Sequence, residues 1–434
     1  MFTDTRNCLI MNKLQNGSME EFVDNMKLKE NAMSKVKGLM ESPMLYLSGG
    51  SKELFHSNFL YWLGVSYRDA FQQTMTRLLN INATWPEGWE VKREYKHLDL
   101  CVTYLKDTGK MRNGESVKKE CAFIILENKV KSLPERTQLK RYEKMFEGYN
   151  QGCSYAVLSL VKKFPGSKYL DENTCWQLHH YDELADVISK YCTADIRKEH
   201  QIYISDYCAY VRELSKLAEG WKVEEDDTFL AQEEGLAELR LNDIYEKVRY
   251  AQIAAMLAEK MKSLLESVAS EEENVVLGMS NTDVILRREH KDAEEILGFY
   301  GCPEANPFQQ VFIGSGMSHG IGLFEAKVKV SNDCCFVLQI QGNRYCHGIE
   351  KQNIVHNSTS LSEWLRNFIE FKFGGLPDHK SKPDSTQCHY KGGFLYKSQK
   401  IDTNVKVRSI VDAMKNDLEM ILSAKLNPKM PTTS

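Results

Sequence analysis

The sequence contains no apolar run that approaches the ~20 residues needed for a membrane-spanning helix. Its first 22 residues include an acidic residue, Asp4, and no long apolar segment, so a secretory signal peptide is not expected. Hydrophobic residues make up 42% of the chain and charged residues 27%, which is the ordinary balance of a globular protein. We therefore expect a globular, cytoplasmic protein without a membrane partner.

No C-x-x-C pair occurs among the twelve cysteines. Most of them lie in apolar, strand-like segments, as Cys101 and Cys121 do, which favours buried free thiols in a reducing compartment over disulfides. The missing pair spacing also argues against a structural zinc site, and less strongly against an iron–sulfur cluster.

No internal repeat or low-complexity segment is visible, and 434 residues are too many for one compact core. Changes in pattern divide the chain into four regions. We expect a helical extension at 1–50, an α/β domain at 51–215, a long acidic-to-amphipathic connecting helix at 216–270, and an α+β domain of unknown role at 271–434.

The region 51–215 alternates helical and strand-like segments. Between its second and third strands, residues 106–116 are rich in turn residues and are predicted to form a connector. The element order predicts a mixed sheet with helices on its faces. The expected helices lie at 52–64, 68–81, 134–149 and 182–191, and the expected strands at 89–95, 97–105, 120–130, 154–161 and 175–181.

Residues 228–268 are predicted to form one long helix, because apolar residues recur at helical spacing. The stripe consists of Tyr250, Ile253, Leu257, Met261 and Leu264. It faces either the core or a partner, so a protein partner or self-association through 228–268 or through 271–434 is left open. Further along, "GSGMSHGIG" at 314–322 is expected to be a hairpin turn, because a phosphate loop requires a following helix.

The formal net charge is −4, but charge is unevenly distributed. Residues 129–144 carry six Lys or Arg against two Glu, whereas residues 219–246 carry ten Asp or Glu against two Lys or Arg. Taken alone, each run is interpreted as a solvated helix face. A minor alternative is that the acidic run shields a basic site before substrate binds.

The stretch "AFIILENKVKS" at 122–132 places two charges at the end of the most apolar strand. Side chains alternate along a strand, so Glu127 and Lys129 share one face and Asn128 lies on the other. Asp99 lies in the preceding strand candidate, and in-register pairing would bring its carboxylate close to that of Glu127. Two such carboxylates repel each other unless a cation lies between them, and a divalent metal with oxygen ligands meets that need.

Asp99 followed by Glu127-Asn128-Lys129 resembles the PD-(D/E)XK nuclease superfamily, with Leu98 where the family motif has proline. Gln138 and Tyr142 match the Q-x-x-x-Y element of its RecB-like group. The resemblance covers roughly residues 51–215 and implies a restriction-endonuclease-like fold. It extends weakly to "LQIQGNRY" at 338–345.

The resemblance implies metal-dependent hydrolysis of phosphodiester bonds in nucleic acid, DNA rather than RNA, in DNA processing or defence against foreign DNA. Mg²⁺ (or Mn²⁺) would be held by Asp99 and Glu127, helped by Glu53 or by the main-chain carbonyl of Asn128. Lys129 would orient or deprotonate the attacking water.

In the helix after the catalytic strand, Gln138 would bind the water or a phosphate, and Tyr142 would brace the helix. Around them, the basic run would contact phosphates of the nucleic acid. The expected nucleic-acid-binding residues are Lys131, Arg136, Lys140, Arg141 and Tyr142.

Three alternatives remain open at this point. The same residues also fit a buried Glu–Lys ion pair, with Asp99 accepting main-chain hydrogen bonds. A nuclease-like fold could bind nucleic acid without cutting it. The chain could also be a non-enzymatic interaction protein whose long helix pairs with a partner.

Overall fold

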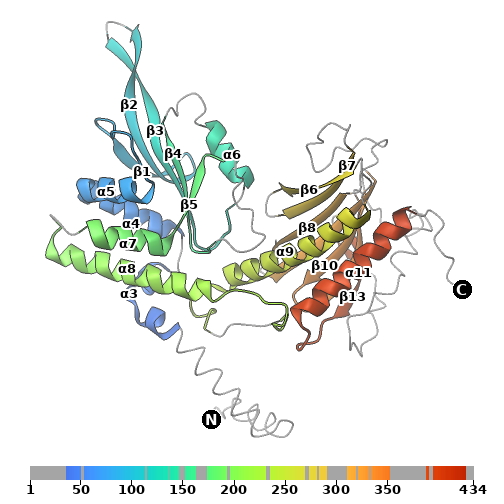
Figure 1. Cartoon of the computed structure of the whole chain (residues 1–434). Helices are drawn as coiled ribbons and strands as arrows, with labels where there is room; N and C mark the ends of the chain where they lie inside the picture. The colour runs from blue at the N-terminus through green and yellow to red at the C-terminus, as the bar shows by residue number, and fades with distance from the viewer. Residues whose placement is uncertain are drawn as a thin grey trace, which may run out of the picture.

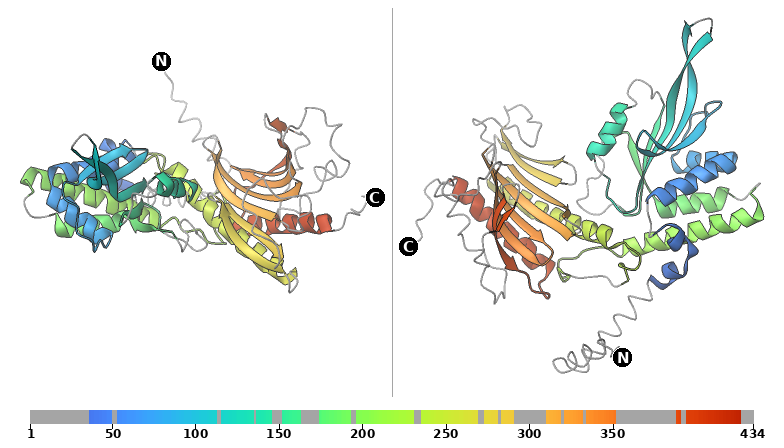
Figure 2. Two further views of the ribbon diagram at one scale, coloured as in Figure 1. Left: turned by 90° about the horizontal axis from the view of Figure 1, so that it is seen from above. Right: turned by 180° about the vertical axis from the view of Figure 1, so that it is seen from behind.

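The computed structural model contains two β-sheets, each flanked by helices (Figure 1). Seen from above, the two sheets lie side by side in an elongated molecule, and helix α9 (Asn242–Val268) extends from one to the other (Figure 2). The structure describes residues 36–49, 53–112, 115–134, 136–145, 152–162, 174–192, 196–230, 235–268, 273–280, 283–290, 310–318, 321–331, 334–351, 388–390 and 394–426.

The first sheet has five strands in the order β1-β2-β3-β4-β5, and it is mixed, as the sequence predicts. The pairs β1–β2 and β2–β3 are antiparallel, whereas β3–β4 and β4–β5 are parallel. The strands are β1 (Glu90–Tyr95), β2 (Leu98–Arg112), β3 (Glu115–Lys129), β4 (Ser154–Ser159) and β5 (Trp176–His180).

Helices cover both faces of this sheet, four on one face and α6 (Arg136–Met145) on the other. Leu139 and Tyr142 of α6 pack with Ile125 of β3 on the α6 face, whereas Leu126 of β3 points into the larger core on the other face. The four helices are α4 (Glu53–Ser66), α5 (Arg68–Leu78), α7 (Tyr181–Tyr191) and α8 (Lys198–Glu219).

The continuous apolar run of β3 follows from this burial on both faces. Ile124 and Leu126 contact the larger core, and Ile125 contacts the smaller core beneath α6. A register shift lies between Val102 and Thr103 of the neighbouring strand. The last residues of β3 lie at the end of both cores. Because side chains alternate, Glu127 and Lys129 are on the same face as Ile125, the face covered by α6.

The predicted connector at 106–116 is wrong for residues 106–112 and 115–116, because these continue β2 and β3; residues 113–114 lie outside the described residues. Pairing extends from Lys106↔Lys119 to Arg112↔Glu115. Turn-forming residues do occur here, and Gly109 has a φ of +70°, but they produce an irregular register between Asp107 and Met111 rather than the end of the strands. The result is a long antiparallel hairpin that projects beyond the rest of the sheet (Figure 1).

The long helix begins later than predicted, at Asn242 instead of residue 228. Residues 221–230 and 235–241 are not helical. Gly235 has a φ of +87°, and a Cβ at this position would lie 2.6 Å from Cγ2 of Val36. The chain turns here to pack closely on the first core, and the buried guanidinium of Arg249 donates to the carbonyls of Thr228 (3.0 Å) and Phe229 (3.2 Å).

The second sheet has eight strands in the order β12-β13-β11-β10-β9-β8-β7-β6, and its neighbours are antiparallel. Ser318 pairs with Ile321 across the antiparallel strands β8 and β9, as the predicted hairpin requires; residues 319–320 lie outside the described residues. The strands are β6 (Glu273–Ser280), β7 (Asp283–His290), β8 (Gln310–Ser318), β9 (Ile321–Ser331), β10 (Cys334–Gln341), β11 (Arg344–Lys351), β12 (Cys388–Tyr390) and β13 (Phe394–Lys400).

Helices α9 and α11 (Val407–Leu426) pack on this second sheet. Ile253, Leu257 and Met261 of the predicted apolar stripe are buried here, so this part of the stripe faces a core. A buried carboxylate joins α11 to β11: Asp417 accepts hydrogen bonds from Tyr345 (2.6 Å) and lies 2.9 Å from Nε2 of His347.

The predicted N-terminal extension and the predicted absence of a membrane-spanning helix can be compared with the described residues. Residues 1–35 of the predicted N-terminal extension lie outside the described residues, and the remainder includes α3 (Pro43–Leu47). Within the described residues, no helix combines the length and the apolar character that crossing a membrane requires.

Candidate active site at the end of β3

The β2–β3 register brings the two predicted carboxyl groups together. Leu100 pairs with Leu126, so Asp99 lies opposite Glu127 at the next position of the antiparallel ladder. One oxygen of Asp99 accepts a hydrogen bond from the main-chain N–H of Asn128, at 2.7 Å. The predicted convergence of Asp99 and Glu127 from adjacent strands is thus present in the structure.

Glu127, Lys129 and Gln138 form one hydrogen-bonded cluster on the α6 side of the sheet. Nζ of Lys129 donates to Oε1 of Glu127 at 2.9 Å and to Oε1 of Gln138 at 2.8 Å. Nε2 of Gln138 donates to the same Glu127 oxygen at 2.9 Å. The second oxygen of Glu127, Oε2, is buried and has no hydrogen-bond partner among the described residues.

Burial and neighbouring groups perturb the carboxyl groups. Burial raises the pKa of Asp99 to about 6, against the lowering effect of the Asn128 hydrogen bond. Burial, together with the charge of Asp99, raises the pKa of Glu127 to about 7, although Lys129 opposes this. For Lys129, burial lowers the pKa, but the charges of Glu127, Glu53 and Asp99 outweigh burial and raise it. Lys129 is therefore a cation, and it does not neutralise the carboxyl pair alone.

Tyr142 has the predicted bracing role. Its hydroxyl donates to the carbonyl of His97 at 2.8 Å and accepts from Gln138 at 2.9 Å, which fixes α6 against the start of β2. Only 2% of Tyr142 is exposed. The prediction that Tyr142 also binds nucleic acid is therefore wrong for this conformation, because its hydroxyl is engaged and its ring is packed near Trp176.

Glu53 lies near the cluster but is bound to a different group. Its Oε1 accepts hydrogen bonds from the main-chain N–H groups of Val130 and Lys131, both at 3.1 Å, and from the hydroxyl of Ser132 at 2.8 Å. The carboxylate thus caps the turn that follows β3. The described residues contain no group of three or more His, Cys, Asp or Glu side chains arranged to hold a metal ion. That Glu53 joins Asp99 and Glu127 as a ligand stays a prediction.

The opposite face of β3 carries a polar contact that the sequence analysis missed. Asn128 is fully buried, donates to the hydroxyl of Ser57 at 2.7 Å and accepts from the hydroxyl of Tyr181 at 3.2 Å. Ser57 lies one helical turn after Glu53, so α4 holds the end of β3 through two residues. The available signal was Asn128 itself, because side-chain alternation along β3 already placed it on the face opposite Glu127 and Lys129.

The basic residues predicted to contact nucleic acid surround the site unevenly. Lys140 and Arg141 are exposed on α6, and Lys131 is half-buried in the turn after β3. The carbonyl of Lys131 accepts a hydrogen bond from Lys247 of α9 at 3.3 Å. The side chain of Arg136 lies outside the described residues.

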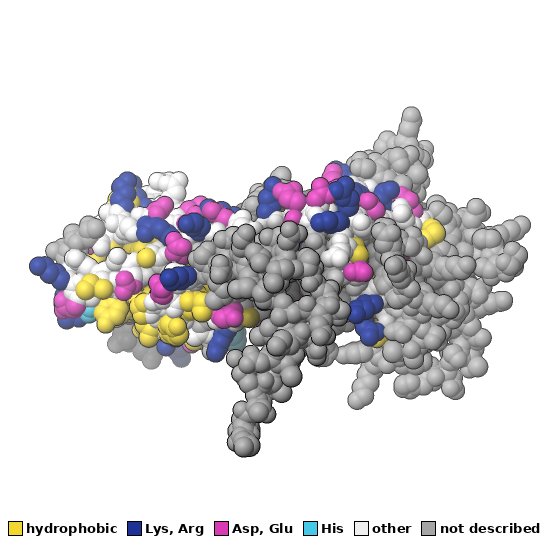
Figure 3. All heavy atoms as spheres, turned by 90° about the horizontal axis from the view of Figure 1, so that it is seen from below, with side chains coloured by type: hydrophobic (Ala, Val, Ile, Leu, Met, Phe, Trp, Pro, Cys, Tyr) yellow, Lys and Arg dark blue, Asp and Glu magenta, His cyan; other side chains and the backbone are white. Residues whose placement is uncertain are grey.

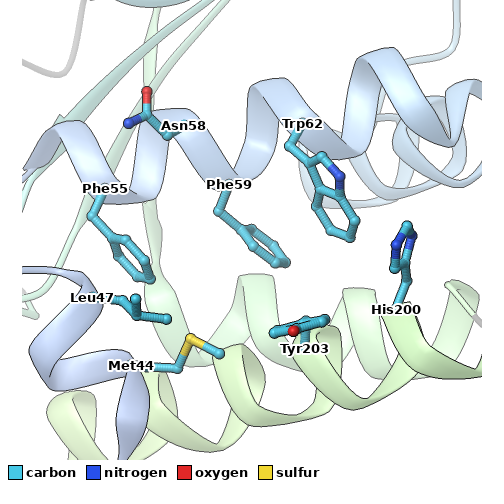
Figure 4. Close-up of a pocket in the computed structure, with 8 residues that line it drawn as sticks. All are labelled: Met44, Leu47, Phe55, Asn58, Phe59, Trp62, His200 and Tyr203. Atoms are coloured by element: carbon cyan, nitrogen blue, oxygen red, sulfur yellow. The ribbon is translucent and has the colours of Figure 1, made fainter.

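A separate apolar groove of about 330 Å³ lies between α3, α4 and α8 (Figure 4). Apolar side chains gather on the face of the molecule seen from below (Figure 3), and Tyr46, Leu47 and Tyr203 are among the most exposed large apolar residues described. The groove lacks a pair of acidic groups, so it does not offer the chemistry of the cluster at β3. Its lining includes Met44, Leu47, Phe55, Phe59, Trp62 and Tyr203.

Comparison of the chain with protein-family models, with curated proteins and with solved structures gave no match.

Proposed function

We propose that the protein is a metal-dependent nuclease of the PD-(D/E)XK type that hydrolyses phosphodiester bonds in DNA. The observation that carries this proposal is the convergence of Asp99, Glu127 and Lys129 at the end of two paired strands, with Gln138 bound to the last two. The mixed five-stranded sheet, with α6 following β3 on the face of this cluster, supports a restriction-endonuclease-like arrangement.

The electrostatics favour this proposal over a purely structural ion pair. Both contacts of the structural alternative are present, since Lys129 lies 2.9 Å from Glu127 and Asp99 accepts from the Asn128 N–H. A neutralised structural pair lowers the pKa of its carboxyl group. Here the pKa of both carboxyl groups is raised, chiefly by burial, and for Glu127 the charge of Asp99 adds to this against the lowering effect of Lys129. One lysine thus does not compensate the two buried carboxyl groups.

The residues fit a divalent cation such as Mg²⁺ or Mn²⁺. The buried Oε2 of Glu127 has no hydrogen-bond partner among the described residues, and oxygen ligands suit these ions. Mg²⁺ commonly uses one or two protein carboxylates and keeps several waters, so Asp99 and Glu127, with the main-chain carbonyl of Asn128, are a sufficient protein contribution. The ion would supply a Lewis acid that polarises the phosphate and makes water more acidic.

The side chains around this position have separate roles in the proposed reaction. Lys129 is protonated, so in this conformation it donates hydrogen bonds and offsets developing negative charge rather than acting as a base. Gln138 holds Lys129 and Glu127 in a fixed relation, and Tyr142 holds Gln138. Exposed Lys140 and Arg141 on α6 are available to contact phosphates, and the pair of Asp99 and Glu127 excludes anions until a cation is bound.

The test is cleavage of single- and double-stranded DNA and of RNA with Mg²⁺, with Mn²⁺ and with chelator. Glu127→Gln and Lys129→Met remove the two charges while preserving approximate size. Glu213→Gln and Lys216→Met on exposed positions of α8 make the same charge changes away from the site. We expect metal-dependent DNA cleavage that falls at least about 100-fold in the site variants, as is typical when electrostatic stabilisation is lost, and that the controls retain.

Cleavage that survives both Glu127→Gln and Lys129→Met would disprove the site. Binding of DNA without cleavage under every metal condition would instead favour the alternative of a catalytically inactive nucleic-acid-binding module. Absence of both binding and cleavage would favour a protein-interaction role.

A further inference from the structure

The outer half of the β2–β3 hairpin is a two-stranded ribbon without neighbouring strands. β1 pairs with β2 only as far as Thr103, and β4 pairs with β3 only from Ile124 onward. Beyond these points, within the described part of the chain, the two strands pair only with each other, and the ribbon projects away from the helices (Figures 1 and 2). A two-stranded ribbon is marginally stable by itself in water, so its length calls for a functional explanation.

Positive charge dominates the exposed surface of this ribbon. Lys106 and Lys119 are exposed and lie directly opposite each other across the two strands. Like charges at directly opposed positions destabilise an antiparallel pair. The other exposed cations of the ribbon are Lys110, Arg112 and Lys118.

The described acidic groups of the ribbon are bound within the protein. Asp107 accepts hydrogen bonds from the main-chain N–H of Gly109, at 2.8 Å, and from the hydroxyl of Ser116. Glu120 accepts from Lys92 of β1 and from the hydroxyl of Tyr95. Glu120 is thus engaged at the base of the ribbon, and Asp107 lies opposite Lys118 within it, while Lys106, Lys110 and Arg112 are exposed along the ribbon.

We propose that this ribbon, residues 104–112 and 115–122, is a second DNA-binding element that enters the major groove of double-stranded DNA. The major groove of B-DNA is wide enough for a two-stranded β-ribbon, whereas that of A-form RNA is not. Phosphates would contact exposed Lys106, and the exposed side chains of Leu105 (62% exposed) and Met111 (70%) offer apolar contact with bases.

The inference rests on the proposed function, because it takes DNA as the ligand. It specifies a duplex as the form that is bound. Strand β3 connects the ribbon to the cluster directly: Lys119 and Glu127 are eight positions apart, roughly 26 Å along a strand. That length corresponds to about eight base pairs, so one short duplex can reach both elements.

Exposed lysines also protect strand edges from aggregation, which is the competing explanation. Edge protection does not require two lysines opposite each other, because one charge on either strand is enough. The substitution Lys106→Glu separates the two explanations. It places opposite charges across the strands, so it should preserve or improve folding, and it should weaken DNA binding.

The experiment measures fluorescence anisotropy of a labelled DNA duplex in chelator, so that binding is read without cleavage. The proteins are the full-length wild type, Lys106→Glu, and Lys198→Glu as a control with the same charge change on exposed α8. We expect Lys106→Glu to weaken duplex binding by roughly tenfold at about 0.1 M salt and to reduce the salt dependence by about one to two phosphate contacts. Lys198→Glu should bind as wild type does.

Equal affinity of Lys106→Glu and wild type, or an equal loss in Lys198→Glu, would overturn the inference. The inference is also overturned if Lys106→Glu weakens binding of single-stranded DNA or of duplex RNA as strongly as that of duplex DNA. The result is independent of catalysis: a protein that cuts DNA but is unaffected by Lys106→Glu retains the nuclease proposal alone. A protein that does not cut DNA but loses duplex binding in Lys106→Glu retains the ribbon alone.

Discussion

Replacing Asp99 with asparagine should stabilise the protein in the absence of metal, although Asp99 is a proposed active-site residue. Its pKa is raised from 3.8 to about 6, chiefly by burial. A shift of about two units corresponds to roughly 3 kcal/mol of unfavourable free energy for the ionised group at neutral pH, where one unit is about 1.4 kcal/mol. The asparagine removes this charge and also relieves the repulsion that raises the pKa of Glu127.

One interaction opposes the gain. The Asn128 N–H donates to the Asp99 carboxylate at 2.7 Å, and a bond to a neutral amide oxygen is weaker by about 1 kcal/mol. The expected net stabilisation at about pH 8 is therefore about 1 to 2 kcal/mol. The size of this stabilisation depends on pH, because raised carboxyl pKa values make the folded state bind more protons than the unfolded chain between about pH 4 and pH 7. In the wild type these groups make stability fall as pH rises through that window.

Urea unfolding in chelator at about pH 4.5 and about pH 8, followed by tryptophan fluorescence, measures the effect. Asp99→Asn should gain stability at the higher pH and little at the lower one, and Asp206→Asn on α8 is the isosteric control. A loss of stability at the higher pH, or the same change at both, would refute the electrostatic reasoning. Added Mg²⁺ should stabilise the wild type at the higher pH and have less effect on the variant.

Four further variants test other contacts. Burial lowers the pKa of His56 to about 3. The free energy of unfolding of the wild type should therefore fall by about 1.4 kcal/mol per pH unit from this group as pH falls below about 6.5, and His56→Gln should lessen that fall. An unchanged pH slope in urea unfolding would contradict this. Tyr142→Phe removes the bond to the His97 carbonyl and should lower the unfolding free energy by about 1 kcal/mol and reduce cleavage, and unaltered values of both would exclude the bracing role. Gly64→Ala would place a Cβ 2.8 Å from Cγ1 of Val91 and should lower the free energy of unfolding by about 1 to 3 kcal/mol. The control is Gly38→Ala, also in a helix, where a Cβ would have nothing within 4 Å. Thermal unfolding should show this control to be neutral or stabilising.

Face alternation along a strand was enough to predict the polar cluster. Because side chains alternate, the positions of Glu127 and Lys129 fixed their common face, and the continuous apolar run before them indicated burial on both sides. The four-residue spacing of Gln138 and Tyr142 placed both on one face of a helix. These inferences need only local periodicity, and the structure has the corresponding contacts.

Features that depend on distant partners were not accessible in the same way. Gly109 and Asp107 are turn formers, so the sequence indicated a connector, but cross-strand pairing continues through them. The start of α9 was misplaced because a helical pattern does not reveal that Gly235 must approach Val36. The hydrogen bonds of Glu53 to the turn after β3 join residues more than seventy positions apart, which no local pattern encodes.

Helix α9 belongs to two hydrophobic cores at once. Val248 is buried with the first sheet, and two residues later Tyr250 begins the contacts with the second. Because α9 is packed in both cores, a tilt of one sheet against the other would require the loss of packing in one of these cores. Because Lys247 also donates a hydrogen bond to the carbonyl of Lys131, a movement of the second sheet would be transmitted to the turn after β3, beside Glu127 and Lys129.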